Sequence, residues 1–352
     1  MREFTAPDEA RAQARTWDVV AAAFAEREPV RRRHVPARPL VALAVVGAVT
    51  AVAFTPPGHA VINSVRKAIG IEHAQRALYS LPTGGRLLVD GWIVNADGST
   101  RRLGDYRETS WSPFGRFVVA ARTDELLALQ ADGTVRWTLA RRNVRFPRWA
   151  GTRVDTRIAY LSGDRLRVVA GNGKGDREAG PARAAPVAPA WRPGGAPFTL
   201  AYADTRGRVW VFEPDTGKLR FRTPAGERPT KLVWSRDGSS LLVVRAGAID
   251  VYDLRGRRAA HAAGRFADAA FVGGRLAVLR PHELTLGTRT LFRTTGTLRQ
   301  VVASPDGRWL LVTWPEADQW LFVGTGGRPR VTAVANIAEQ LGGGFAVDGW
   351  TS

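Results

Sequence analysis

The chain of 352 residues contains no cysteine, one methionine and five histidines. Without cysteine it cannot form a disulfide, a thiolate nucleophile, a cysteine-ligated zinc site or an iron–sulfur cluster. The stability of the folded domain must therefore come from its hydrophobic core. We expect no cofactor and no metal site.

Lysine is also scarce, with four residues in the whole chain, so that the formal net charge of +19 comes almost entirely from arginine. Residues 1–38 contribute only +2 of it, residues 39–65 carry no charged side chain, and the rest is spread evenly. A nucleic-acid interface usually concentrates its basic residues on one face or helix, so a nucleic-acid partner is not expected. The even spread favours the arginine bias of a GC-rich genome, and a surface for anionic polymers or lipid head groups is the alternative.

Residues 1–38 predict an amphipathic helix followed by a basic flank. Apolar side chains recur at helical spacing and include Trp17, Val20 and Phe24. Because an isolated helix of this length is marginal in water, we expect this stripe to bind a cytoplasmic partner or to self-associate. The alternative is a loosely ordered tail whose many alanines imitate a stripe.

Residues 39–55 form the one long apolar run, which is near the lower length limit for a membrane-spanning helix. Four arginines precede it, at positions 31, 32, 33 and 38, and no ionisable Lys, Arg, Asp or Glu follows until Arg66. The positive-inside rule then places the N-terminus in the cytoplasm and the remainder outside the cell membrane. A cleaved signal peptide is the alternative, because Ala51-Val-Ala53 fits a small-residue cleavage site.

Residues 56–83 begin with two prolines that end the apolar helix. A short amphipathic segment follows, with Val61, Ile62 and Val65 on one face and Arg66 and Lys67 on the other. We interpret this stretch as a juxtamembrane linker that either lies on the outer membrane surface or packs under the next domain.

From residue 84 to 352 the pattern changes to short strands separated by Gly, Asp and Pro turns. Six segments with an apolar end, a tight turn and a hydrophobic strand recur about every forty residues, which is typical of β-propeller blades. They start at positions 111, 149, 191, 234, 271 and 302. We letter the four strands of a blade a to d from the centre outward, and interpret the tryptophans at positions 111, 149, 191 and 234 as inter-blade core at the end of strand a.

Strands near Arg86, Trp92 and Arg101 precede these six repeats without a strand a, and Phe345–Trp350 supplies one strand after them. Joining the two ends completes a seventh blade and removes the exposed sheet edges of an open array. The sequence therefore predicts an all-β fold, a β-propeller of seven four-stranded blades preceded by an N-terminal helix and one transmembrane helix. A six-bladed ring is the alternative.

The run Ser304-Pro-Asp-Gly-Arg-Trp-Leu-Leu-Val312 resembles the WD40-like propeller repeat of the TolB family, and the resemblance covers roughly residues 84–350. The whole layout is similar to the uncharacterised single-span, membrane-anchored propeller proteins of high-GC Gram-positive bacteria. This resemblance implies a propeller in the cell envelope and names no ligand.

The repeats contain no recognisable catalytic motif. Gly-x-Ser-x-Gly elbows, Walker loops and calcium loops are missing. Of the two histidines in this region, His261 is expected in a d–a connection and His282 at the start of a strand, neither with a carboxylate at metal-ligand spacing. We predict a protein that is not an enzyme and has no catalytic residues; a propeller hydrolase or lyase is the second alternative.

One loop has the character of a binding site. Four arginines surround an aromatic residue in what we expect to be a d–a connection at the rim of the central channel: Arg141, Arg142, Arg145, Phe146 and Arg148. Several guanidinium groups at such a rim could clamp a carboxylate or phosphate. A solvated arginine-rich loop is the alternative.

Together these features predict a membrane-anchored, extracytoplasmic propeller that binds a protein or an anionic envelope component. The first alternative is a transmembrane regulator with a layout like that of anti-sigma factors, in which the cytoplasmic helix holds a partner and the propeller senses a ligand. The sequence does not indicate an oligomeric state.

Overall fold

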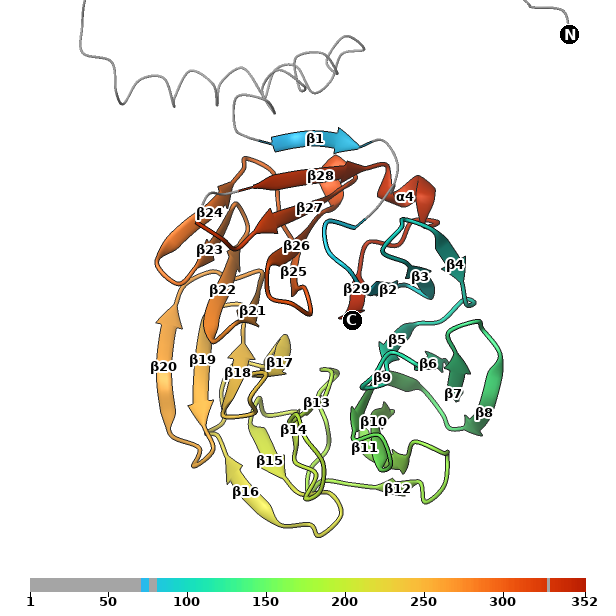
Figure 1. The fold of residues 1–352 in the computed structure, drawn as a ribbon. Coiled ribbons are helices and arrows are strands. Elements are labelled where there is room, and N and C mark those ends of the chain that lie inside the picture. The colour runs from blue at the N-terminus through green and yellow to red at the C-terminus, as the bar shows by residue number, and fades with distance from the viewer. Residues whose placement is uncertain (1–70, 76–80, 328–329) are drawn as a thin grey trace, which may run out of the picture. The chain divides into compact units, whose positions relative to one another are not determined.

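The structure, a computed structural model, describes residues 71–75, 81–327 and 330–352. In these residues the strands form seven sheets around a central axis, antiparallel except for one edge strand, so that each sheet is one blade of a closed β-propeller (Figure 1). The all-β prediction and the count of seven blades are confirmed, and the six-bladed alternative is wrong. The predicted N-terminal helix (1–38) and membrane span (39–55) lie outside the described residues.

Each blade has four strands, a to d from the centre outward. Blade 1 contains β29 (Val347–Thr351), β2 (Arg86–Val89), β3 (Trp92–Val94) and β4 (Thr100–Arg102); blade 2 contains β5 (Glu108–Trp111), β6 (Phe117–Arg122), β7 (Glu125–Gln130) and β8 (Val135–Ala140); blade 3 contains β9 (Val144–Gly151), β10 (Thr156–Ser162), β11 (Arg165–Ala170) and β12 (Arg177–Glu178); blade 4 contains β13 (Ala190–Trp191), β14 (Leu200–Ala203), β15 (Val209–Phe212) and β16 (Leu219–Arg222).

The remaining blades follow the same order. Blade 5 contains β17 (Lys231–Trp234), β18 (Ser240–Val244), β19 (Ala248–Asp253) and β20 (Arg258–Ala263); blade 6 contains β21 (Asp268–Val272), β22 (Arg275–Arg280), β23 (Glu283–Leu286) and β24 (Arg289–Arg293); blade 7 contains β25 (Gln300–Ala303), β26 (Trp309–Trp314), β27 (Gln319–Gly324) and β28 (Val331–Ala335). Two short helices, η1 (Pro315–Ala317) and α4 (Ile337–Gln340), accompany blade 7.

The middle of the second strand of each blade is apolar on both faces, because neighbouring blades cover both of them. In β6, Val118 and Ala120 pack toward blade 1, whereas Val119 and Ala121 pack toward blade 3. All four side chains are fully buried. Because successive side chains of a strand point to opposite faces, one strand contributes to two separate inter-blade cores. This explains the continuous hydrophobic runs in the sequence of these strands.

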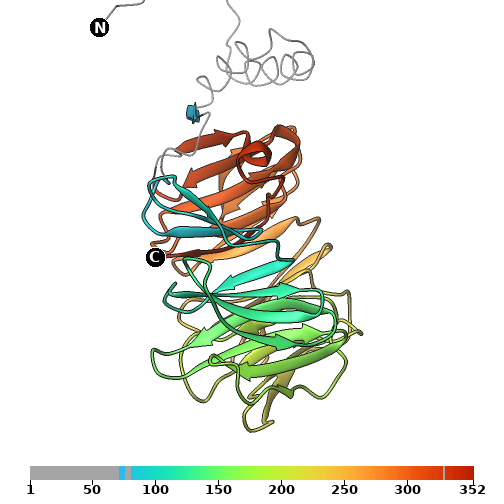
Figure 2. The ribbon, with the colours of Figure 1, turned by 90° about the vertical axis from the view of Figure 1, so that its right-hand side faces the viewer.

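Blade 1 closes the ring with strands from both ends of the propeller. Strand β29 pairs antiparallel with β2, with Leu87 opposite Trp350 and Leu88 opposite Gly349. The predicted closure by the C-terminal strand is therefore confirmed. Of the two faces of the ring, one carries the a–b and c–d turns and is called the turn face below; the other carries the b–c turns and d–a connections and is called the connection face (Figure 2).

A fifth strand, β1 (Ile71–Gln75), pairs in parallel with the outer edge of blade 7, with Ile71 opposite Val331 (Figure 1). These residues belong to the stretch 56–83, which the sequence predicts to be a linker. No turn or hydrophobic alternation marks this pairing in the sequence, since it depends on the unpaired edge that β28 offers.

The Ser-x-Asp-Gly runs form a recurring a–b turn. In blade 7 the Ser304 hydroxyl donates to Asp306 over 2.6 Å and accepts from the Trp309 amide over 2.9 Å, while Gly307 takes a φ of 69°. Blade 5 repeats the contact between Ser235 and Asp237. Side-chain hydrogen bonds to the local backbone and a positive φ at glycine are what such a turn requires.

The tryptophans that end strand a are inter-blade core, as predicted. Three of them, at positions 111, 191 and 234, are buried and the fourth, Trp149, is half-buried. The Trp234 indole N–H donates to the Ala190 carbonyl oxygen over 3.1 Å, and Trp191 donates to the Arg148 carbonyl oxygen over 2.9 Å. These two indoles therefore join their blades to strand a of the preceding blade.

Candidate functional site

Polar side chains from three adjacent inner strands meet beside the ring closure. The Thr109 hydroxyl of β5 donates to Asp348 of β29, and Arg145 of β9 forms an ion pair with Glu108 of β5. We call these four residues and Arg148 of β9 the channel cluster. It links blades 1, 2 and 3 through side chains that lie on strand a of each blade.

Burial dominates the electrostatics of the channel cluster. It raises the pKa of Asp348 to about 7, while the Thr109 hydrogen bond and the positive charge of Arg148 oppose the rise and the charge of Asp90 adds to it. Burial likewise lowers the pKa of Arg148, against the opposing effect of Asp348 and Glu108. The charge of Asp348 therefore changes near neutral pH.

A shallow depression of about 620 Å³ lies on the connection face over blades 1 and 2. We call it the mouth depression. Its lining residues come from the b–c turns of both blades and from the connection between them: Asp90, Asp105, Tyr106, Arg107, Arg122, Thr123, Asp124 and Glu125. Both charge signs and an aromatic ring are thus present, with the Arg122 guanidinium 5.2 Å from the centre of the Tyr106 ring.

The connection between blades 2 and 3 borders the mouth depression. The Arg107 guanidinium donates to the Asn143 side-chain oxygen over 3.3 Å, and the Asn143 amide donates to Asp124 over 3.1 Å. Asn143 takes a positive φ of 47°, a conformation that asparagine tolerates better than most residues. These contacts join the connection that carries Arg142 to two lining residues of the mouth depression.

The predicted arginine-rich loop is divided between two environments. Only residues 141–143 form the d–a connection, and Arg145, Phe146 and Arg148 lie within β9. Pro147 fits this strand because strand a has an unpaired edge toward the channel, where a missing N–H costs nothing. The pairing with β10 shifts its register here, and Phe146 takes a φ of 53°.

The four arginines of this loop do not meet at one point. Arg141 pairs with Asp176 of blade 3 at 2.6 Å, Arg145 pairs with Glu108, and Arg148 donates to the Pro147 carbonyl oxygen over 2.8 Å. Arg142 is exposed, and no acidic side chain in the described ranges lies within ion-pair distance of it.

The aromatic residue of the loop, Phe146, packs against side chains of its own blade and of the next blade. Phe146 is half-buried against the core between blades 3 and 4, and the Arg145 guanidinium lies 4.6 Å from its ring centre. The partner-binding stripe predicted at Trp17, Val20 and Phe24 lies outside the described residues.

One histidine is placed differently from the prediction. His261 lies in β20, an outer strand, and not in a d–a connection, and its Nδ1 is 2.7 Å from the Asp250 carboxylate. Asp250 and His261 are directly opposite in the β19–β20 pairing, which brings together residues eleven positions apart. The buried Arg245 binds the same carboxylate at 2.6 Å, so this group is an inter-strand network.

The site residues predicted from the sequence do not include Asp90, Glu108, Thr109 and Asp348. Each is a single polar residue in or beside an ordinary strand, and their spacing in the chain carries no motif. Among the described residues, no group of three or more His, Asp or Glu side chains could hold a metal ion. In the same part of the chain, no helix has both the length and the apolar character that crossing a membrane requires.

Comparison with known proteins finds similarity in the fold and none in the sequence. No protein-family model and no curated protein matches the sequence. A solved structure described as the mitotic checkpoint complex matches with a TM-score of 0.53 at 12% identity, covering 70% of this chain and 87% of the other. A structure described as the Dos1 propeller matches with a TM-score of 0.51 at 11% identity, covering 64% of this chain and 71% of the other.

At these identities the likeness concerns the fold alone, and the fold of this chain is a seven-bladed β-propeller.

Proposed function

We propose that this chain is a membrane-tethered propeller that binds a protein ligand outside the cytoplasm and catalyses no reaction. The apolar run at 39–55 with its four preceding arginines supports the tether and its orientation. The Ser-Pro-Asp-Gly repeat unit supports a relationship to TolB-type proteins of the bacterial envelope.

The observation that carries the binding role is the mouth depression on the connection face. It combines a tyrosine, two arginines and four carboxylates in a shallow hollow. Protein interfaces are enriched in tyrosine and arginine, and a mixture of charges gives specificity toward a partner of complementary charge. A hollow with both signs suits a folded protein surface better than a uniformly charged polymer.

An anionic envelope component is the second candidate, because Arg142 is exposed and its neighbour Asn143 contacts two lining residues of the mouth depression. Such a ligand would depend on Arg142 and on the exposed Arg122, and it would be insensitive to changes at Tyr106. A protein ligand would depend on all three side chains.

Photo-cross-linking in native cells, with the reactive side chain at position 106, tests the proposal. We expect one protein cross-linked in high yield, and loss of the cross-link when Arg122 and Arg142 are both replaced by glutamate. The matched control is Arg206→Glu, an exposed arginine in the b–c turn of blade 4, which should leave the cross-link intact. Cross-linking only to polysaccharide or lipid would favour the second candidate, and no cross-link at all would refute both.

A further inference from the structure

The exposed large hydrophobic side chains are all on one face of the ring. Phe114 and Val154 occupy a–b turns, Leu254 a c–d turn, and Val135 and Leu219 are the first residues after c–d turns. Val154 is 96% exposed and Phe114 50% exposed. In the described ranges, none of the large exposed hydrophobic residues lies on the connection face.

Each of these apolar side chains has an exposed basic neighbour within two positions. The neighbours are Arg116, Arg136, Arg153, Lys218 and Arg255. The Arg153 guanidinium also lies 5.6 Å from the ring centre of Phe114, so that the tips of blades 2 and 3 form one apolar and cationic group. Apolar tips flanked by cations are the composition that binds an anionic lipid surface.

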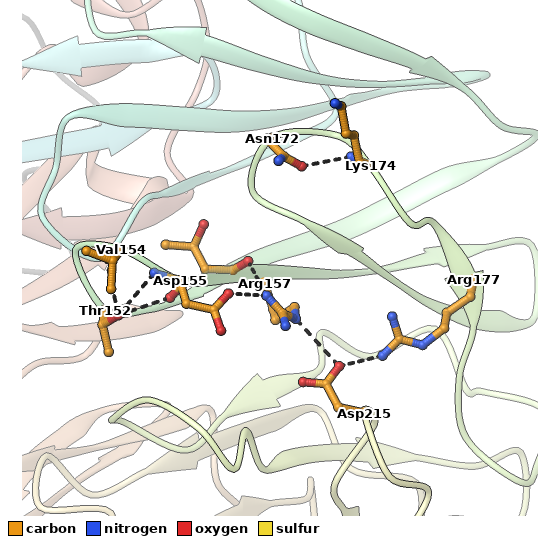
Figure 3. Close-up of polar contacts among 9 residues, drawn as sticks. Thr152, Val154, Asp155, Arg157, Asn172, Lys174, Arg177 and Asp215 are labelled. Carbon is orange, nitrogen blue, oxygen red and sulfur yellow. Dashed lines mark hydrogen bonds and ion pairs between the residues drawn. The ribbon is translucent and has the colours of Figure 1, made fainter.

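The turn that presents Val154 is firmly built (Figure 3). The Thr152 hydroxyl accepts from the Val154 amide over 3.4 Å and from the Asp155 amide over 3.1 Å. Asp155 pairs with Arg157, which lies 3.5 Å from Asp215 of blade 4. The exposed valine is thus held away from the core by a network that spans two blades.

The chain enters the propeller at the same face. Strand β1 runs parallel to β28 with Ile71 opposite Val331, and β28 starts at the c–d turn of blade 7. Ile71 therefore lies at the turn face. Residues 56–70 separate it from the proposed membrane span, and a chain of that length reaches at most about 55 Å.

We propose that the turn face docks onto the outer surface of the membrane, with the five apolar tips at the level of the lipid head groups and the basic neighbours on anionic lipid. This inference rests on the proposed tether. It leaves the connection face, with the mouth depression, directed away from the membrane toward a ligand. A flat lipid surface suits tips that are spread over blades 2 to 5, whereas a single protein groove would meet only some of them.

Single-cysteine labelling tests the docking, because the chain contains no cysteine of its own. The full chain, reconstituted in phosphatidylcholine vesicles with phosphatidylglycerol, carries an environment-sensitive fluorophore at V154C. The matched control carries it at T205C, an exposed position in the b–c segment of blade 4 on the connection face. We expect head-group quenchers to quench the label at position 154 and not the label at position 205.

Replacing one basic side chain of the turn face tests whether this face contacts the anionic lipid or only lies near it. Arg153→Gln should shift the equilibrium between docked and undocked propellers about fivefold toward undocked, since one basic residue at an anionic surface contributes on the order of 1 kcal/mol. Arg206→Gln on the connection face is the control and should change nothing. Vesicles of phosphatidylcholine alone should give the undocked signal for the unsubstituted chain.

The outcomes separate this inference from the tether. A chain that resists carbonate extraction but shows equal quenching at both positions, or none, would refute the docking and keep the tether. A chain that carbonate releases from the vesicles would refute both. Unquenched V154C that native membranes nevertheless protect from a water-soluble maleimide would assign the turn face to a protein and overturn the lipid assignment.

Discussion

The Thr109 hydroxyl on the inner strand of blade 2 donates a hydrogen bond to Asp348 on the ring-closing strand of blade 1, across 239 positions of sequence. Thr109 is fully buried. The contact joins the C-terminal strand to the second blade, so the charge of Asp348 and the closure of the ring are coupled.

Asp348→Asn should remove the part of the pH dependence of the unfolding free energy that comes from this carboxyl. Folding raises the pKa of Asp348 to about 7 through burial, so the folded state holds this proton more tightly than the unfolded state. The protonated Asp348 carboxyl contributes to the free energy of unfolding in full below about pH 4. This contribution is lost as the pH rises through about 7. We expect the variant to exceed the unsubstituted protein in unfolding free energy by about 1–3 kcal/mol at pH 8.

Urea unfolding at pH 5 and pH 8 measures this difference. Asp105→Asn, which removes a highly exposed carboxylate, is the control and should stay within about 0.5 kcal/mol at both pH values. An equal effect of D348N at the two pH values would contradict the titration of this residue near neutral pH.

Thr109→Val should destabilise the ring by about 1–3 kcal/mol at pH 8, because the half-buried Asp348 carboxylate would lose its hydroxyl donor. The same change should raise the pKa of Asp348 further, since the hydrogen bond from Thr109 lowers it. Thr109→Ser keeps the donor and should restore most of the stability. If both variants behave alike, the effect comes from packing and not from the hydrogen bond.

Trp234→Ala should cost about 3–5 kcal/mol, the usual range for truncating a buried large aromatic side chain. Trp234 is 6% exposed, packs in the core between blades 4 and 5 and donates to the Ala190 carbonyl oxygen. Thermal and urea unfolding provide the measurement. Leu254→Ala, at an exposed turn, should change stability by less than about 0.5 kcal/mol; comparable losses for the two variants would argue against the inter-blade role of the tryptophan.

Deleting residues 344–352 should open the ring, because it removes β29 and exposes the edge of β2. An unpaired, apolar strand edge promotes aggregation. Light scattering and sedimentation of the truncated protein check this expectation. Removal of Ser352 alone, which lies beyond β29, is the control, and a monomeric truncation with unchanged stability would disprove the role of the closure.

The full chain should remain with membranes after washing with carbonate or high salt, with its N-terminus inside, because of the apolar run at 39–55 and the arginines before it. Protease protection of an N-terminal tag measures the orientation. Deletion of 39–55 is the matched control and should release the protein. Recovery of a mature soluble protein that begins near Phe54 would show a cleaved signal peptide instead.

The architecture could be predicted closely because its signals are local. Each inner blade strand needs apolar residues on both faces, and each Ser-x-Asp-Gly turn satisfies its hydrogen bonds within five residues of sequence. The need to bury sheet edges then predicted that Phe345–Trp350 returns to Arg86–Val89. Strand β1 could not be predicted, since a parallel pairing with a distant edge leaves no trace in either segment.

The residues that meet in the candidate site could be predicted only in part. The arginines at 141–148 were noticed for their density along the chain, yet their side chains diverge to Asp176, Glu108 and solvent. The position of Asn143 at the mouth depression depends on Arg107 and Asp124, which belong to other segments. A high density of arginines along the chain therefore does not predict that their side chains meet in the folded protein.

The sequence by itself determined the repeat, the strands, the turns and the number of blades, because hydrophobic alternation and turn chemistry act over a few residues. Only the tertiary structure decided which polar groups meet in the channel cluster and which face carries the exposed hydrophobic tips. Those properties depend on how seven sheets curve around one axis, which brings Glu108, Arg148 and Asp348 together from three separate strands. Burial in that setting, and not the identity of the residue, raises the pKa of Asp348 to about 7.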